Sequence, residues 1–156
     1  MTDFERRISA AQGYTELGML DDAIAELDAM DAAVQHSSAV IEMRLLILMR
    51  AKRWSQALPL GYELCRLHPD ATAGFVHAAF CLHELGRTRE ARETLLAGPP
   101  AMQQEPTYFY NLACYDVALG NSEQALRNVE RSFQMDKRYR EFAMNDPDLA
   151  SIRHLL

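Results

Sequence analysis

Three residues with metal-binding side chains share one stretch: His77, followed by Cys81 and Glu84 at four and seven residues. At this spacing the side chains fall along one face of a helix, and imidazole and thiolate are ordinary ligands of zinc. Two soft ligands on a single helix are nevertheless a weak pattern for a metal site. We therefore expect no metal site and no cofactor.

No combination of residues in the sequence indicates catalysis. There is no nucleophile beside a base, no glycine-rich phosphate loop and no pair of carboxylates in a buried stretch. Charged groups such as Asp21-Asp22 and Arg87, Arg89 and Glu90 fit helix ends and solvated surface. We expect no catalytic residues, so the protein is predicted not to be an enzyme.

Composition indicates the cellular setting and argues against two kinds of partner, membranes and nucleic acids. The three cysteines, Cys65, Cys81 and Cys114, are odd in number and follow no disulfide spacing, which indicates free buried thiols in a cytoplasmic setting. The longest uncharged apolar run, residues 45–49, is too short for a membrane span, and the N-terminus has no signal core. The net charge of −6 argues against nucleic acid, because binding to phosphates needs a basic face.

A repeat of 34 residues organises the 156-residue chain. Turn positions Gly18, Lys52, Gly86 and Gly120 recur at this interval, as do Ala23, Ala57, Ala91 and Ala125. Apolar residues on either side of each turn recur at helical spacing. The sequence therefore predicts an all-α solenoid, a single domain over 1–156, built from helix–turn–helix units at 4–37, 38–71, 72–105 and 106–139.

Local signals predict where several helices begin. Ser37, Ser55, Asp70 and Thr88 are expected N-caps, and Pro106 is expected at a first helical position. Residues 98–105 are the longest irregular connection and the expected hinge. After the fourth unit, Asp146 and Pro147 should begin a further helix. We expect the segment 140–156 to cover the end of the stack, because a terminal repeat has no next neighbour.

One core position departs from the pattern. Gly61 stands where the other units carry Leu27, Leu95 and Val129, so a side chain is missing there. Either Phe75 fills the space, or the backbone of a neighbouring helix approaches closely.

These columns resemble the tetratricopeptide repeat. The matching positions are Ala11, Tyr14, Gly18, Ala23 and Leu27 in the first unit, Ala79, Leu82, Gly86, Ala91 and Leu95 in the third, and Ala113, Gly120, Ala125 and Val129 in the fourth. Asp116, Lys52 and Gly61 depart from the family pattern. The resemblance covers residues 4–139 and implies a right-handed superhelix whose first helices line a concave groove for a protein or peptide.

The resemblance places an apolar set of side chains in that groove. The predicted partner-binding residues are Leu46, Met49, Arg50, Val76, Phe80, His83, Tyr110, Cys114 and Val117. Aromatic and methionine side chains suit an amphipathic helix or an extended apolar peptide. The prediction is a scaffold or adaptor, with a dedicated chaperone of a secreted protein or a homo-oligomeric structural subunit such as a homodimer as alternatives. Burial of these residues by the chain's own C-terminal segment is a further alternative.

Overall fold

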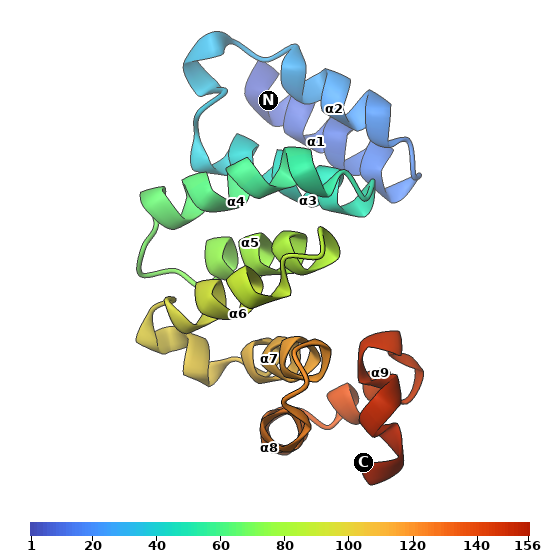
Figure 1. Ribbon diagram of the computed structural model, residues 1–156. Helices are drawn as coiled ribbons and strands as arrows, with labels where there is room; N and C mark the ends of the chain where they lie inside the picture. Colours follow the sequence, from blue (N-terminus) through green and yellow to red (C-terminus); the bar gives the residue numbers. More distant parts are fainter.

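The computed structural model describes all 156 residues and contains nine α-helices and three 3₁₀ helices, with no β-strand. Eight of the α-helices form four antiparallel pairs, stacked one below another in Figure 1. The pairs are α1 (Asp3–Glu16) with α2 (Leu20–Asp28), α3 (Ser38–Arg50) with α4 (Trp54–Leu67), α5 (Ala73–Glu84) with α6 (Thr88–Leu96), and α7 (Pro106–Ala118) with α8 (Ser122–Met135). The remaining elements are α9 (Arg138–Asn145) and the 3₁₀ helices η1 (Ala32–Val34), η2 (Pro100–Gln104) and η3 (Pro147–Leu155). The structure is the all-α repeat solenoid that the sequence predicts.

All four tight turns use the same backbone hydrogen bond. The amide two residues beyond the C-cap donates to the carbonyl five residues earlier, as in Asn121 to Asp116 at 2.8 Å. Gly18, Gly86 and Gly120 adopt the left-handed conformation that this turn requires, with φ of 75°, 78° and 82°. Lys52 adopts it with φ of 57°, although a side chain makes this region unfavourable by about 1 kcal/mol or more.

The shared turn also explains why two predicted caps are wrong. The N-caps of α4 and α6 are Arg53 and Arg87. The predicted caps, Ser55 and Thr88, lie within the first turns of these helices instead. Neither arginine side chain forms a capping hydrogen bond. The backbone hydrogen bonds of the turn determine which residue stands at the N-cap, whatever its side chain.

The caps at the connections between pairs fare differently. Ser37 is the N-cap of α3, but its hydroxyl donates to the Val34 carbonyl at 2.7 Å instead of capping. Asp70 is not the cap of α5, which begins two residues after Ala71 with Thr72 at the N-cap. Pro106 and Pro147 stand at first helical positions as predicted, and the Asp146 carboxylate accepts from the Asp148 amide at 2.9 Å.

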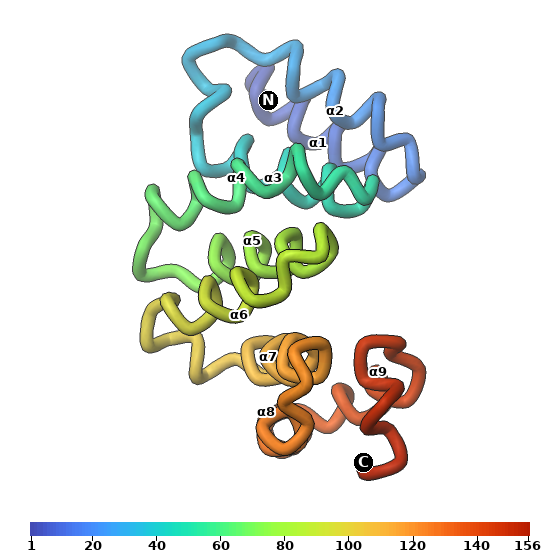
Figure 2. Tube along the Cα trace, viewed as in Figure 1, coloured from blue at the N-terminus to red at the C-terminus, as the bar shows by residue number.

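The connections between pairs run along one side of the stack, opposite the turns of the first three pairs (Figure 2). Residues 98–105 are more regular than the sequence predicts, because η2 forms within them and buries Met102. A side chain at Gly98 would meet the Met102 side chain at 2.8 Å. The segment is therefore anchored to the core by its own methionine.

Two hydrophobic cores hold the stack. A core of 25 buried residues runs from α3 to η3, whereas a smaller core of 6 residues joins the first pair to α3. The smaller core consists of Ala11, Ala23, Leu27, Met30, Val40 and Ile47. Leu17 lies at the α1 C-cap and is 75% exposed. The first pair is therefore attached through a modest apolar contact.

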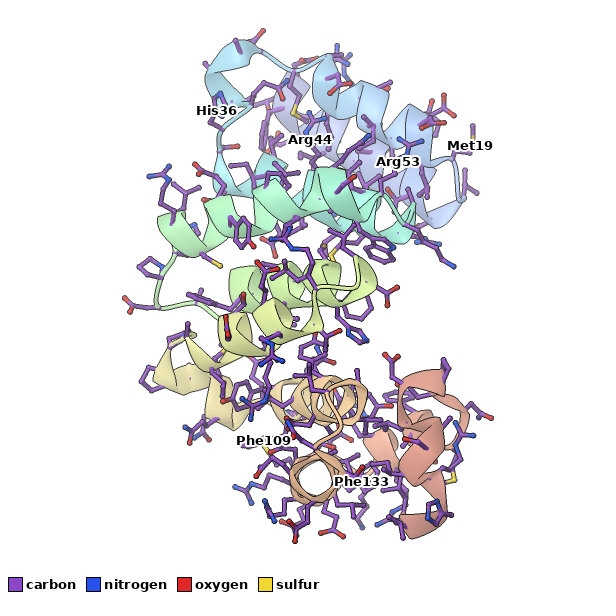
Figure 3. All side chains as sticks on the ribbon, in the orientation of Figure 1. Met19, His36, Arg44, Arg53, Phe109 and Phe133 are labelled. Carbon is purple, nitrogen blue, oxygen red and sulfur yellow. The ribbon has the colours of Figure 1, made fainter.

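Hydrogen-bonded ion pairs also join the first helix pair to the second. Arg44 of α3 donates to the Asp28 carboxylate at 2.6 Å, and Arg53 donates to Asp21 at 2.5 Å. Both arginines reach α2 and are labelled in Figure 3. The Gln35 amide donates to the carbonyls of Leu27 and Met30, which satisfies the C-terminal end of α2.

Glycines let α4 and α5 approach closely. A Cβ built on Gly61 would lie 3.0 Å from the Ala78 Cβ, and one on Gly74 would lie 2.7 Å from the Cys65 amide nitrogen. The second explanation for the missing side chain at Gly61 is therefore correct: the Ala78 backbone, not Phe75, occupies the space.

Asp116 of α7 is a buried carboxylate at the contact of α6, α7 and α8. Its side chain is fully buried, where Arg92 donates at 2.7 Å and Asn128 donates at 2.9 Å. This departure from the family pattern is therefore satisfied by two partners from neighbouring helices, as a buried carboxylate requires.

The sequence predicts that segment 140–156 covers the end of the stack, but the segment takes a different position. It turns back after α8, and η3 packs mainly against α7 (Figure 1). Leu149, Ile152 and Ala143 are its buried side chains. These three side chains are buried there because α7 presents apolar groove positions such as Tyr110 and Cys114 to the segment.

Replacement of Gly61 by Ala should lower the free energy of unfolding by about 1–2 kcal/mol, because the added methyl overpacks against Ala78. Gly13→Ala is the matched control, since Gly13 lies within α1 with no atom in reach of an added methyl. It should gain about 0.5–1 kcal/mol from helix propensity. Urea denaturation followed by circular dichroism measures both, and equal gains would contradict the close approach.

Replacement of Arg92 by Ala should lower the free energy of unfolding by about 2–3 kcal/mol, because it removes the cationic partner of a buried carboxylate. Arg89→Ala removes an exposed arginine of the same helix that forms no ion pair, and should change stability by less than about 0.5 kcal/mol. Thermal and urea unfolding compare the two; similar small losses would mean that Asp116 does not depend on Arg92.

Candidate functional site

The nine predicted partner-binding residues lie on the first helices of the second, third and fourth pairs, but they differ in exposure. Leu46 and Arg50 of α3 are exposed, whereas Tyr110 and Cys114 of α7 are buried. The other five, Met49, Val76, Phe80, His83 and Val117, are partly buried. Exposure thus falls from α3 towards α7.

The C-terminal segment accounts for burial on α7. The Tyr110 hydroxyl donates to the Asp146 carboxylate at 2.7 Å, and the Tyr110 ring packs on Tyr139 with centroids 5.2 Å apart. The hydroxyl groups of Thr107 and Tyr139 form a hydrogen bond of 2.5 Å. Burial, followed by the hydrogen bond to Asp146, raises the pKa of Tyr110, so the phenol keeps its proton. Segment 138–156 therefore fills the groove over α7.

The free energy gained by burying its side chains keeps this segment in place. Leu149 and Ile152 are at most 1% exposed, and burial of such a side chain contributes about 1.5–3 kcal/mol. Arg153 adds a hydrogen bond to the Asp146 carbonyl at 2.7 Å. Displacement of the segment would cost several times thermal energy, so a ligand has to use the part of the groove that it leaves open.

His83 links the C-terminal segment to α5. Its Nε2 lies 3.0 Å from the Asp148 carboxylate, and its Nδ1 lies 2.9 Å from the Thr88 hydroxyl. The hydrogen bond to Asp148 raises the pKa of His83, and burial opposes this. The Tyr115 ring stacks on the imidazole with centroids 4.9 Å apart.

The order of hydroxyl, imidazole and carboxylate matches that of a nucleophile-activating triad. None of the five hollows is lined by Thr88, His83 or Asp148. The arrangement holds the C-terminal segment against α5.

The His77, Cys81 and Glu84 face of α5 does not converge on one point. Cys81 is fully buried, and burial raises the pKa of its thiol to about 11. Glu84 is exposed at the helix end, while burial lowers the pKa of His77. A thiol held protonated is a poor metal ligand.

An open apolar groove lies between α1 and α3. One hollow of about 260 Å³ is lined by Phe4, Ile8, Ala39, Glu42, Met43 and Leu46. A second of about 340 Å³ is lined by Gln12, Thr15, Glu16, Met43, Leu46 and Ile47. Because both share Met43 and Leu46, they form one continuous surface, which we call the α1–α3 groove.

Of the nine predicted residues, Leu46 alone lines this groove. Phe80 packs on Trp54 with ring centroids 5.6 Å apart, and Met49, Val76 and Val117 pack against the large core. Phe4 and Met43, which also line the groove, are not among the predicted site residues. The spacing of four residues between Ala39 and Met43 was the signal that could have placed Met43 beside Leu46.

Comparisons with known proteins agree with this architecture. The family model of the tetratricopeptide repeat matches residues 48–113. A MamA chain (41-end) from Desulfovibrio magneticus RS-1 is similar with a TM-score of 0.78 and 12% identity, over 99% of this chain and 89% of that one. YrrB, described as a TPR protein with an unusual peptide-binding site, has a TM-score of 0.72 and 19% identity, over 96% and 73%.

A MamA structure of strain MSR-1 gives a TM-score of 0.72 and 19% identity, over 85% of this chain and 76% of that chain. No curated protein sequence matches this chain. None of the helices has both the length and the apolar character needed to cross a membrane.

The fold and its groove define a helical-repeat solenoid, a class that generally supplies non-catalytic surfaces for protein interaction. Within that class the chain resembles the tetratricopeptide-repeat proteins, whose family model matches residues 48–113. The sequence-based resemblance is thereby confirmed.

Stability should depend on pH through His83. Because the folded state raises its pKa, the added stability is complete below the unfolded value of about 6.5 and disappears as pH rises through the folded value. The stability difference between wild type and His83→Gln should therefore be larger at about pH 6 than at about pH 8.5. Urea titrations at both pH values test this, and Asp148→Asn should abolish the same difference. A difference that does not change with pH would contradict the charged pair.

Proposed function

We propose that this protein is an interaction scaffold that binds a peptide or an amphipathic helix in the α1–α3 groove. The observation that carries the proposal is the continuous apolar lining of two open hollows. Leu46 is exposed there, and Phe4, Ile8 and Met43, which pack in part against the small core, line the hollows beside it. Apolar surface outside a core is typical of a contact site.

Two further observations support a preformed site on these helices. The chain seats its own segment 138–156 on the equivalent face of α7, through apolar side chains and hydrogen bonds to Tyr110 and His83. YrrB, which shares the fold, is described as having a peptide-binding site. Helices that are already folded before binding lose little conformational freedom on binding, so most of the ordering cost falls on the ligand.

Leu46→Glu should weaken peptide binding by at least about tenfold, because it places a charge at the centre of the apolar lining. Tyr62→Glu is the matched control: each native side chain is 44% exposed, and Tyr62 lies on α4, the second helix of the same pair. Both variants should keep wild-type helicity. A random-peptide library displayed on phage, selected on the wild-type protein, supplies the ligands.

Peptides that bind wild type and Tyr62→Glu but lose at least about tenfold in affinity for Leu46→Glu support the proposal, which corresponds to about 1.4 kcal/mol. Selection of no peptide, or equal binding by both variants, would reject it. Sedimentation of the free protein reports the homodimer alternative: a mass that doubles with concentration in wild type and not in Leu46→Glu would assign the groove to a second copy.

A further inference from the structure

The α1–α3 groove combines an apolar floor with carboxylates that have no partner. Glu42 lines the hollow that contains Phe4 and Ile8, and Glu16 lines the adjoining one. Both are exposed, and neither forms an ion pair or a side-chain hydrogen bond. Most other charged side chains of the first two pairs are matched, such as Arg7 with Glu26 and Arg44 with Asp28.

The surroundings leave the negative charge of Glu42 uncompensated. His77 of α5 is close enough to Glu42 to sense its charge, but burial lowers the pKa of His77, so the imidazole is neutral near pH 7. Arg50, one helical turn beyond Leu46, is the single cation among the groove positions and stands at the Glu16 end. The end of the groove around Phe4, Ile8 and Glu42 is therefore apolar and acidic.

We infer that the α1–α3 groove takes a peptide segment in which lysine or arginine flanks an apolar stretch. This inference rests on the proposed function and names the chemistry of its ligand. Two adjoining hollows accept two apolar anchors, and a cation beside the first anchor meets Glu42. An acidic segment would instead bring like charges together in a groove that has one cation to offer.

Charge complementarity selects this occupant over a plain hydrophobic one. An apolar peptide without charges fills the hollows but leaves the carboxylates as they are, whereas a basic flank adds attraction and speeds encounter. Such exposed pairs are weak individually, so the effect belongs to specificity more than to affinity.

The test uses the tightest peptide from the phage selection, synthesised with a fluorescent label in three forms whose flanks are lysine, glutamine or glutamate. Anisotropy titrations with the full chain should show the lysine form binding about fivefold to tenfold more tightly than the glutamine form, and the glutamate form binding most weakly. The preference should shrink towards unity in about 1 M salt.

Glu16→Gln/Glu42→Gln should remove the preference while leaving affinity for the glutamine form unchanged. Glu93→Gln/Glu130→Gln is the control with the same net charge: both residues are exposed on second helices and unpaired, so the preference should persist. Equal affinity for the lysine and glutamine forms would overturn the charge inference and leave the groove proposal intact. Binding that depends on charge but survives Leu46→Glu would overturn both.

Discussion

The close contact between α4 and α5 is the interaction on which the stack depends. Gly61 and Gly74 remove two side chains from the junction, so that Ala78 and the Cys65 backbone lie in van der Waals contact with the opposite helix. Dispersion forces fall steeply with separation, and this junction joins the first two pairs to the last two. Leu58, Leu64, Ala79 and Leu82 then bury their side chains on either side of it. The 25-residue core is continuous because this approach is close.

A repeat stack has an unsatisfied face at each end of the molecule and along its groove. This chain satisfies the face over α7 with its own residues 138–156, held by Leu149, Ile152 and the hydrogen bonds of Asp146 and Asp148. It leaves the corresponding face over α1 and α3 open. The groove is thus half internal core and half surface, and the surface half has the unpaired carboxylates.

Much of the fold could be predicted from the sequence because the repeat itself records the geometry. The glycines at 34-residue intervals mark left-handed turn positions, and the alanines mark places where paired helices touch. The site was harder to predict. An apolar residue on a first helix can face the groove, a neighbouring helix or the C-terminal segment, and Tyr110, Phe80 and Leu46 take these different environments. The pattern of segment 140–156 fits a helix against the stack end or against α7, and only the three-dimensional packing distinguishes them.

The separate 6-residue core of the first pair makes the N-terminal hairpin the least strongly attached unit of the stack. In a linear array each unit is stabilised by its own contacts and by its neighbours, and this unit has a neighbour on one side only. We therefore expect local opening of α1 and α2 to need less free energy than opening of α5 to α8. Since the α1–α3 groove spans the boundary between the two cores, an occupant would bridge them and oppose that opening.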